Sequence, residues 1–133
     1  MSDVKYNNKW FKSGLELLNE VLYGKWKFII IWNLIDKSLR FSDLRKQIPS
    51  ITDRMLSLQL KELEEEGFIQ RVISEGTPAK VDYTLTHKAR GIIPALEELE
   101  NYGRSIALNN FNESVSKSTP SLTDEQESFF DRL

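Results

Sequence analysis

The stretch 41-FSDLRKQIPSITDRMLSLQLKELEEEG-67 predicts two helices joined by a very short connection. Ser42 can cap the first helix, and Pro49 ends it because proline disfavours helical geometry in the residue before it. Three residues then separate this helix from Thr52, which is a good N-cap for the second helix. The second helix is expected to end at Gly67, which suits the left-handed position after a helix. Two helices joined by such a turn fit a helix-turn-helix.

The second helix of this pair has one apolar and one polar face. Each residue turns an α-helix by about 100°, so Leu56, Leu60 and Leu63 cluster within about 60° and are expected to face the core. The opposite face carries Arg54, Ser57, Leu58 and Lys61. These groups can hydrogen-bond base edges, contact a thymine methyl group and neutralise phosphates in a DNA major groove. The glutamates follow at the far end, where a recognition helix leaves the DNA.

The elements around this pair predict an α+β, mainly helical fold: a winged helix-turn-helix with a two-stranded wing and N- and C-terminal dimerisation helices. A helix over about residues 13–23 and a strongly apolar helix over 25–36 are expected before the pair. After it, the β-rich segments 68–74 and 81–85 predict a β-hairpin, the wing. Thr86 is expected to cap one final long helix.

The chain divides into three predicted parts. Residues 1–12 show no clear period and are expected to form an N-terminal arm. Residues 13–108 are expected to form the winged helix-turn-helix domain, including the terminal dimerisation helices. Residues 109–133 are expected to form a polar C-terminal tail. Because no leader opens the chain and no apolar run approaches the roughly 18 residues of a membrane span, we expect a cytoplasmic protein without membrane contact.

The net charge of the chain hides an uneven distribution. The chain has 18 basic and 20 acidic residues, a net charge of −2. Residues 24–61 carry eight basic and three acidic side chains, a net charge of +5, whereas residues 91–133 carry three basic and eight acidic ones, a net charge of −5. A local basic patch sets the field that a polyanion meets at contact. The overall charge is therefore no argument against DNA binding.

Composition disfavours several kinds of chemistry. The chain has no cysteine and a single histidine, His87. These counts remove disulfides, thiolate nucleophiles, cysteine–zinc sites and multi-histidine metal sites, so we expect no metal and no cofactor. No spacing suggests a paired-carboxylate site, a glycine-rich phosphate loop or a nucleophile elbow, so an enzyme is disfavoured. His87 itself is expected to be an ordinary first residue of a helix.

Three longer stretches carry a family resemblance. They are GKWKFIIIWNLI (24–35), RFSDLRKQIPSITDRMLSLQLKELEEEGFIQR (40–71) and PAKVDYTLTHKARGIIPALEEL (78–99). Their order and spacing resemble the HxlR-type winged helix-turn-helix transcriptional regulators of bacteria, over roughly residues 13–107. The resemblance implies homodimers that bind palindromic DNA operators, with terminal helices forming the dimer interface. By position, it also assigns Arg54, Ser57, Gln59 and Lys61 to the recognition helix, Arg40 and Arg45 to supporting contacts, and Thr77–Lys80 to the wing.

The candidate residues combine this resemblance with the basic side chains near helix starts and the wing. The predicted DNA-binding residues are Lys25, Lys27, Arg40, Arg45, Thr52, Arg54, Ser57, Leu58, Gln59, Lys61, Thr77 and Lys80. The predicted dimer interface consists of Leu15, Leu18, Leu22, Ile92, Leu96, Leu99, Gly103 and Ile106. An apolar stripe of this size is expected to bury against a second subunit. The expected partners are therefore double-stranded DNA and a second copy of the chain.

Alternatives remain for the partner. The strongest rival is a winged-helix protein-interaction module that does not bind DNA. Double-stranded RNA is disfavoured because its deep, narrow major groove does not admit a helix.

The input signal is also open. Many regulators that this chain resembles sense oxidants or electrophiles through a cysteine near the start of their first helix, and the chain has no cysteine. A thiol sensor is therefore excluded, and a small-molecule effector of unknown identity is one alternative. Six aromatic residues either line an effector pocket or fill the core and the dimer seam. They are Trp10, Phe11, Tyr23, Trp26, Trp32 and Tyr102.

Overall fold

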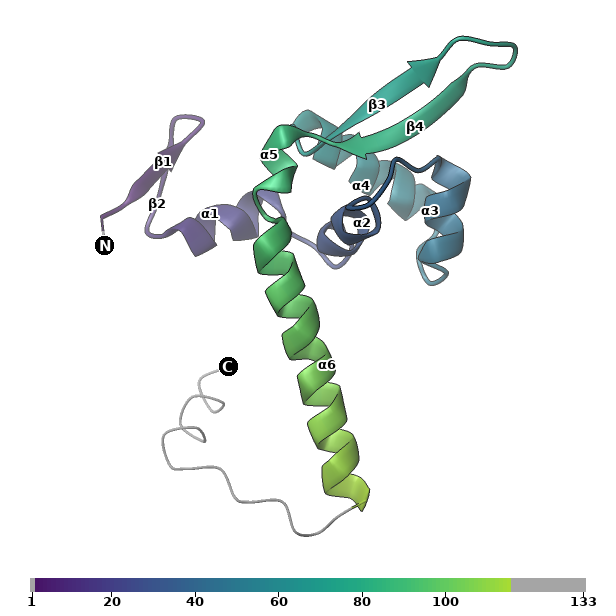
Figure 1. Cartoon of the computed structure of the whole chain (residues 1–133). Coiled ribbons are helices and arrows are strands. Elements are labelled where there is room, and N and C mark those ends of the chain that lie inside the picture. The colour runs from purple at the N-terminus through teal and green to yellow at the C-terminus, as the bar shows by residue number, and fades with distance from the viewer. Residues whose placement is uncertain (1, 116–133) are drawn as a thin grey trace. The chain divides into compact units, whose positions relative to one another are not determined.

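The computed structural model describes the backbone of residues 2–115 and the side chains of residues 2–109 (Figure 1). The chain divides into two compact units, residues 1–96 and residues 97–133. Most of the predicted polar tail, residues 116–133, lies outside the described residues. Residues 109–115 belong to the last helix, so the predicted start of that tail is too early.

The first unit contains two β-hairpins and five helices, followed by the start of a sixth helix (Figure 1). Strands β1 (Val4–Tyr6) and β2 (Lys9–Phe11) pair antiparallel. The helices that follow are α1 (Gly14–Val21), α2 (Lys27–Asn33), α3 (Phe41–Gln47) and α4 (Asp53–Glu65). The second antiparallel hairpin consists of β3 (Ile69–Ser74) and β4 (Lys80–Leu85), and α5 (His87–Arg90) and α6 (Ile93–Val115) end the described chain. The predicted α+β winged helix-turn-helix fold is confirmed.

Local signals place the boundaries of α4 as predicted. The hydroxyl group of Thr52 accepts a hydrogen bond from the N–H of Met55 at 3.1 Å, so it caps the first turn. After the helix, Gly67 has a φ of +80°, a left-handed conformation that side chains with a Cβ rarely adopt. This turn sends the chain into β3. The wing is thereby positioned by the end of α4.

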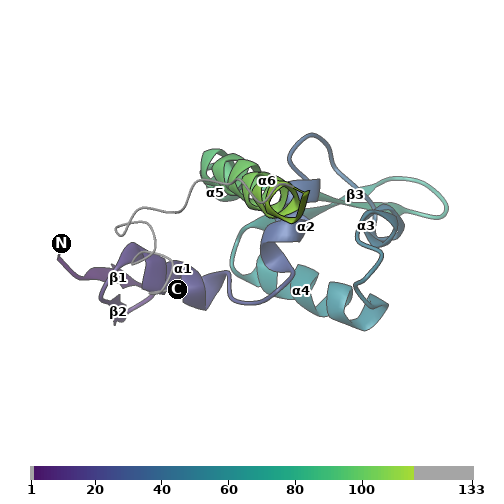
Figure 2. The same ribbon diagram turned by 90° about the horizontal axis from the view of Figure 1, so that it is seen from below.

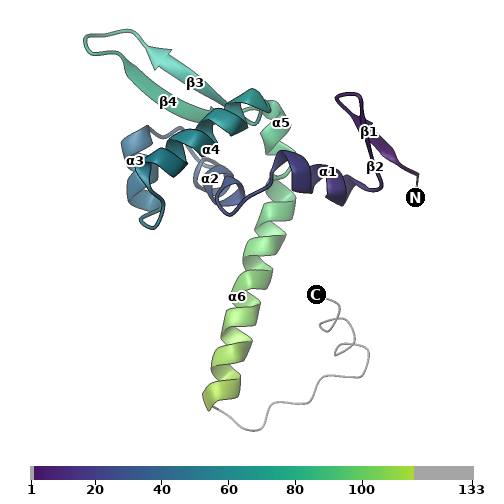
Figure 3. The same ribbon diagram turned by 180° about the vertical axis from the view of Figure 1, so that it is seen from behind.

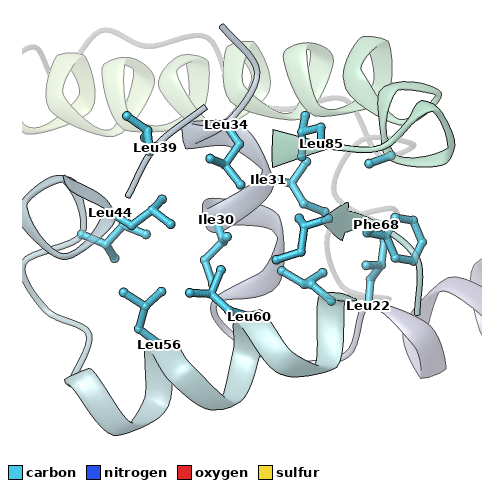
Figure 4. Packing of buried hydrophobic residues seen from close by; sticks show 14 of the residues in the cluster. Leu22, Ile30, Ile31, Leu34, Leu39, Leu44, Leu56, Leu60, Phe68 and Leu85 are labelled. Atoms are coloured by element: carbon cyan, nitrogen blue, oxygen red, sulfur yellow. The ribbon is translucent and has the colours of Figure 1, made fainter. Parts of the chain in front are cut away.

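Helix α2 forms the centre of the core (Figure 4). Ile30 and Ile31 of α2 are completely buried, as are Leu44 of α3 and Leu56 of α4. Leu85, at the end of β4, joins the same cluster. Helices α3 and α4 therefore pack on a common apolar centre, which leaves their remaining faces available to solvent.

The two hairpins lie at opposite ends of the first unit (Figures 2 and 3). The loop of the β3–β4 hairpin projects on the side of α3, whereas the β1–β2 hairpin adjoins α1. Leu39, in the connection between α2 and α3, pairs with Tyr83 of β4. The Leu39 N–H donates to the Tyr83 carbonyl oxygen at 3.0 Å, and the reverse bond is 2.7 Å long. These bonds fasten the wing to the segment before α3.

The predicted N-terminal arm, residues 1–12, contains the β1–β2 hairpin, which the sequence analysis did not anticipate. Its turn places Asn7 and Asn8 at φ values of 48° and 63°. Asparagine tolerates this left-handed region, which two-residue hairpin turns require. Strands of three residues are too short to show a clear alternation. The Asn7–Asn8 pair was the one feature of the sequence that indicated a hairpin turn here.

Two helix boundaries also differ from the prediction. Helix α3 begins at Phe41 after an N-cap at Arg40, whereas Ser42 was the expected cap. The backbone N–H of Arg40 donates to Asp43 at 3.4 Å. The expected single final helix is two helices, α5 and α6, because the chain turns near Gly91. Thr86 caps only α5, whose first residue is His87, as predicted.

Candidate DNA-binding surface

The two faces of α4 lie as the helical period predicts. Leu56, Leu60 and Leu63 are buried in the core. On the other side, Arg54, Ser57 and Lys61 are exposed, and Leu58 is 46% exposed although its side chain is apolar. The outward face therefore offers a guanidinium, a hydroxyl, an ammonium and an aliphatic group within about two helical turns.

Two residues predicted to bind DNA are turned away from this face. Lys27 is only 5% exposed, and its Nζ lies 2.6 Å from Oε2 of Glu62. Gln59 is 8% exposed, and its amide nitrogen contacts the sulfur of Met55 at 3.5 Å. Neither side chain can reach DNA, so both predictions are wrong. The helical period already indicated that Gln59 is buried, because its side chain lies about 60° from that of Leu56 around α4. The burial of Lys27 could not be predicted in this way, because it depends on the packing of α2 against α4.

Three arginines around α4 are held by carboxylates of neighbouring elements. Arg45 of α3 pairs with Asp53 at the start of α4. Arg40 lies 3.8 Å from Asp82 of β4. The Nε of Arg71, on β3, lies 2.9 Å from Oε2 of Glu64 on α4 and was not among the predicted site residues. These pairs orient the guanidinium groups and neutralise carboxylates beside α4.

Other basic side chains on this surface are free of such pairs. Within the part of the chain that the structure describes, no carboxylate oxygen lies within 4.0 Å of the ammonium or guanidinium nitrogens of Lys46, Arg54, Lys61 or Lys80. All four residues are exposed. Lys25, also exposed, lies with its Nζ 4.7 Å from the centre of the Trp26 ring. Unpaired, exposed cations are the groups that phosphates attract.

The exposed face of α4 is bordered by two hollows. One, of about 400 Å³, lies between α4 and the wing, and Ser57, Lys61, Arg71 and Tyr83 contribute to its lining. The other, of about 560 Å³, lies between α3 and the start of α4 and includes Lys46. The helix therefore stands between concave surfaces that carry basic groups.

The wing carries its predicted residues at its outer end. Ser74 pairs with Lys80 at the last position of the hairpin, and Thr77 lies in the loop between the strands. Thr77 and Lys80 are exposed. Ile73 is also exposed, so the tip combines one ammonium group with apolar surface.

The predicted dimer residues fall into two groups. Leu22 and Leu96 are buried in the core of the first unit, so they stabilise that unit and cannot contact a partner. Their assignment to the dimer interface is wrong. Leu15, Leu99 and Ile106 are exposed. The remaining members are Leu18 and Ile92, which pack partly against the core, and Gly103, which has open space at its Cα.

The five aromatic residues of this set that lie in the first unit do not all line one pocket. Trp10, Phe11 and Tyr23 line a hollow between β2 and α1. Trp26 packs partly against the core, and Trp32 of α2 is exposed outside that hollow. Tyr102 is exposed on α6, in the second unit.

The described residues offer no group of three or more His, Asp or Glu side chains arranged to hold a metal ion. None of the helices in this part of the chain has both the length and the apolar character that crossing a membrane demands.

Comparison with known proteins places this surface in context. The family described as HxlR-like helix-turn-helix matches residues 21–110. YdeP of Bacillus subtilis, an uncharacterized HTH-type transcriptional regulator, is 42% identical over 101 residues, which cover 75% of this chain and 79% of YdeP. An uncharacterized HTH-type transcriptional regulator of Methanothermobacter thermautotrophicus is 43% identical over 91 residues, covering 68% of this chain and 70% of that protein.

A solved structure shares the fold as well as the sequence. The redox regulator HypR in its oxidized form is 40% identical, has a TM-score of 0.67, and is matched over 70% of this chain and 96% of the HypR chain. The helix-turn-helix, the wing and the outward face of α4 therefore occur in a chain whose relatives are regulators. The protein belongs to the HxlR-like helix-turn-helix family and is a DNA-binding transcriptional regulator.

Proposed function

We propose that the protein binds a palindromic DNA operator as a homodimer, with the exposed face of α4 in the major groove. The observation that carries this proposal is the division of charge on α4. Arg54 and Lys61 point outward, whereas Glu62 and Glu64 are paired with basic residues of α2 and β3. The outward face thus carries a guanidinium in the first turn of α4, the end that a helix-turn-helix inserts into DNA, and an ammonium about two turns later.

Each exposed group has a role that suits its chemistry. Arg54 reads a guanine, because its fork of N–H donors matches the O6 and N7 acceptors. Leu58 contacts a thymine methyl group, and Ser57 hydrogen-bonds a base edge. Lys61 and Lys46 neutralise phosphates beside the groove, and Lys80 does so from the wing.

The remaining predicted residues support these contacts. Thr52 sets the start of α4, where free backbone N–H groups favour a phosphate. Arg45 and Arg40, held by Asp53 and Asp82, offer oriented guanidinium N–H donors to phosphates beside α4. Lys25 and Thr77 contact the phosphate backbone of the DNA at the edges of the surface.

Arg54→Ala is expected to weaken binding to the specific operator by about 1–3 kcal/mol, roughly 5- to 150-fold, and to relax specificity at one base pair. The measurement is a titration of DNA selected by the purified protein against variants of that DNA. Lys80→Ala is the matched control, because loss of a phosphate contact should weaken all sequences alike. A sequence-selective loss for Lys80→Ala, or a uniform loss for Arg54→Ala, would contradict these roles.

The same titration separates DNA binding from the alternative, a protein-interaction module. If a dimer makes about six phosphate contacts, its affinity should fall by about a thousandfold between roughly 50 and 200 mM salt. Binding that is absent, or that ignores salt, would rule out the DNA-binding surface proposed for α4.

The proposal of a dimer is based on exposed apolar side chains, which would be in contact with water in a monomer. Leu99, Tyr102, Ile106 and Leu108 of α6 are exposed, as is Leu15 of α1. Such side chains gain free energy when a second copy covers them. Two recognition helices of the dimer would then contact half-sites about 34 Å apart.

Sedimentation at micromolar concentration should give twice the 15.5 kDa mass of the chain. Leu99→Glu should shift the particle toward the monomer, because it introduces a charge into an apolar contact. Leu58→Glu, an equal change at an exposed leucine of α4, should leave the dimer intact. A 15.5 kDa particle for the unchanged protein would overturn the dimer.

The signal that controls the protein is proposed to act without thiol chemistry. HypR is described as a redox regulator, and this chain contains no cysteine. The chain therefore lacks the nucleophile that oxidants attack most readily. A ligand that binds by non-covalent contacts is the remaining kind of input proposed for it.

A further inference from the structure

A hollow of about 560 Å³ lies between β2 and α1, away from the proposed DNA-binding surface. Its lining includes three aromatic side chains, Trp10, Phe11 and Tyr23. The polar lining includes Glu16, Glu20 and Lys9. It is an open concavity of the surface, with aromatic walls and a few polar groups, and its volume is sufficient for a small molecule.

Two of the three aromatic rings of this hollow already have an ammonium group of the chain nearby: the Nζ of Lys5 lies 5.5 Å from the centre of the Trp10 ring, and that of Lys9 lies 5.4 Å from the centre of the Phe11 ring. Trp10 is 63% exposed and Tyr23 is 75% exposed, although both are large and mainly apolar. The face of an aromatic ring carries negative charge density, so it attracts a cation that can come within about 6 Å of its centre. The rings therefore favour a ligand that is both apolar and positively charged.

The charged groups of the hollow point to the same class of ligand. Two carboxylates and one ammonium group leave its lining with a net charge of −1. Lys9 pairs with Glu20, and its Nζ lies 5.4 Å from the centre of the Phe11 ring. The carboxylate of Glu16 accepts a hydrogen bond from the backbone N–H of Lys12 at 2.9 Å. Among the described residues, no nitrogen of a basic side chain lies within 4.0 Å of this carboxylate. The hollow thus already holds one ammonium between a carboxylate and a ring, and its lining includes a second carboxylate, that of Glu16.

The hollow and the proposed dimer surface use different faces of α1. With about 100° per residue, Glu16 and Glu20 point more than about 90° away from Leu15 and Leu18. A ligand in the hollow and a partner on the leucine side therefore do not compete for the same face.

The hairpin beside the hollow is fastened to the end of the recognition helix. Lys88 of α5 donates to the hydroxyl of Tyr6 on β1 at 2.5 Å and to the carbonyl oxygen of Glu66 at 2.7 Å. Its Nζ also lies 5.0 Å from the Tyr6 ring and 4.8 Å from the Phe68 ring. One ammonium group therefore joins the β1–β2 hairpin to the last turn of α4. Any ligand that moves the hairpin acts on the helix through this group.

We propose that the hollow between β2 and α1 binds a small organic cation, an amine or quaternary ammonium with an aromatic group, and that this ligand is the signal. The ammonium lies near Glu16, and the apolar part stacks on Trp10 and Tyr23. The signalling role rests on the proposed function, whereas the binding site does not depend on it.

Calorimetric titration of the full chain with benzyltrimethylammonium, without DNA, tests the site. We expect saturable binding that Trp10→Ala weakens about two- to fivefold, the effect of losing a cation–π contact at an exposed ring. Glu16→Gln should weaken it similarly, because glutamine keeps the acceptor for Lys12 but removes the charge. Glu65→Gln, an exposed glutamate of α4, is the matched control and should change nothing.

Two further probes identify the recognised chemistry. Benzenesulfonate has the same ring with the opposite charge and should not bind, and benzyl alcohol, which is neutral, should bind much more weakly. Equal affinity for benzyltrimethylammonium and benzyl alcohol would overturn the cation site. So would an unchanged affinity in Trp10→Ala.

Titration of operator DNA with and without benzyltrimethylammonium tests the signalling role. We expect the cation to change DNA affinity in the unchanged protein but not in Lys88→Met, which should still bind the cation. Cation binding with no change in DNA affinity would overturn the signalling role and leave the site standing. Failure to bind DNA even without the cation would instead contradict the proposed function.

Discussion

Leu56→Ala should lower the free energy of unfolding by about 2–5 kcal/mol, because it removes a completely buried side chain and leaves a cavity. Leu58→Ala, two residues away on the same helix, should change stability by no more than about 0.5 kcal/mol, since Leu58 is exposed. Urea unfolding followed by circular dichroism measures both. The two variants make the same chemical change on opposite faces of α4.

The DNA titration should rank these two variants in the reverse order. At a temperature where both are folded, Leu58→Ala should weaken operator binding more than Leu56→Ala, because only Leu58 is proposed to touch a base. A stability loss for Leu58→Ala equal to that of Leu56→Ala would show that Leu58 is buried, for example in an interface. That result would remove Leu58 from the DNA-binding surface.

Glu62→Gln should lower the free energy of unfolding by about 3 kcal/mol, since it leaves the buried ammonium of Lys27 without its counter-ion. This value is at the low end of the usual range for a broken buried pair, because the side chain of Glu62 is 38% exposed and glutamine keeps an acceptor. Denaturant unfolding provides the measurement. Glu65→Gln, an exposed position on the same helix, should have an effect near zero.

A double variant separates charge from packing at this site. Lys27→Met combined with Glu62→Leu should recover most of the stability lost in Glu62→Gln, because apolar side chains need no counter-ion. A double variant as unstable as the single one would mean that the shape of the Lys27 and Glu62 side chains, not their charge, holds α2 against α4.

Some features of α4 could be predicted because their causes are local. The N-cap at Thr52, the end near Gly67 and the 100° turn per residue involve only neighbours within a few positions. They were sufficient to separate Leu56, Leu60 and Leu63 from the exposed side. The family resemblance predicted the same fold, and the family match confirms that membership.

Other features depended on contacts between distant segments. A lysine in the first turn of a helix normally extends into water, and nothing near Lys27 in the sequence indicates that α4 supplies Glu62 beside it. Likewise, Leu22 and Leu96 fit the pattern of an interface stripe, yet they pack into the core of their own unit. The tie between Tyr6 and Lys88 spans 82 positions.

The sequence by itself thus determined the element order of the winged helix-turn-helix, the outward face of α4 and the absence of a thiol. These follow from periodicity, capping and composition, which are properties of short segments. Only the tertiary structure decided which basic residues stay available to DNA, which leucines belong to the core and where the aromatic hollow lies. Burial and ion pairing are set by the elements that pack on a residue, and these come from elsewhere in the chain.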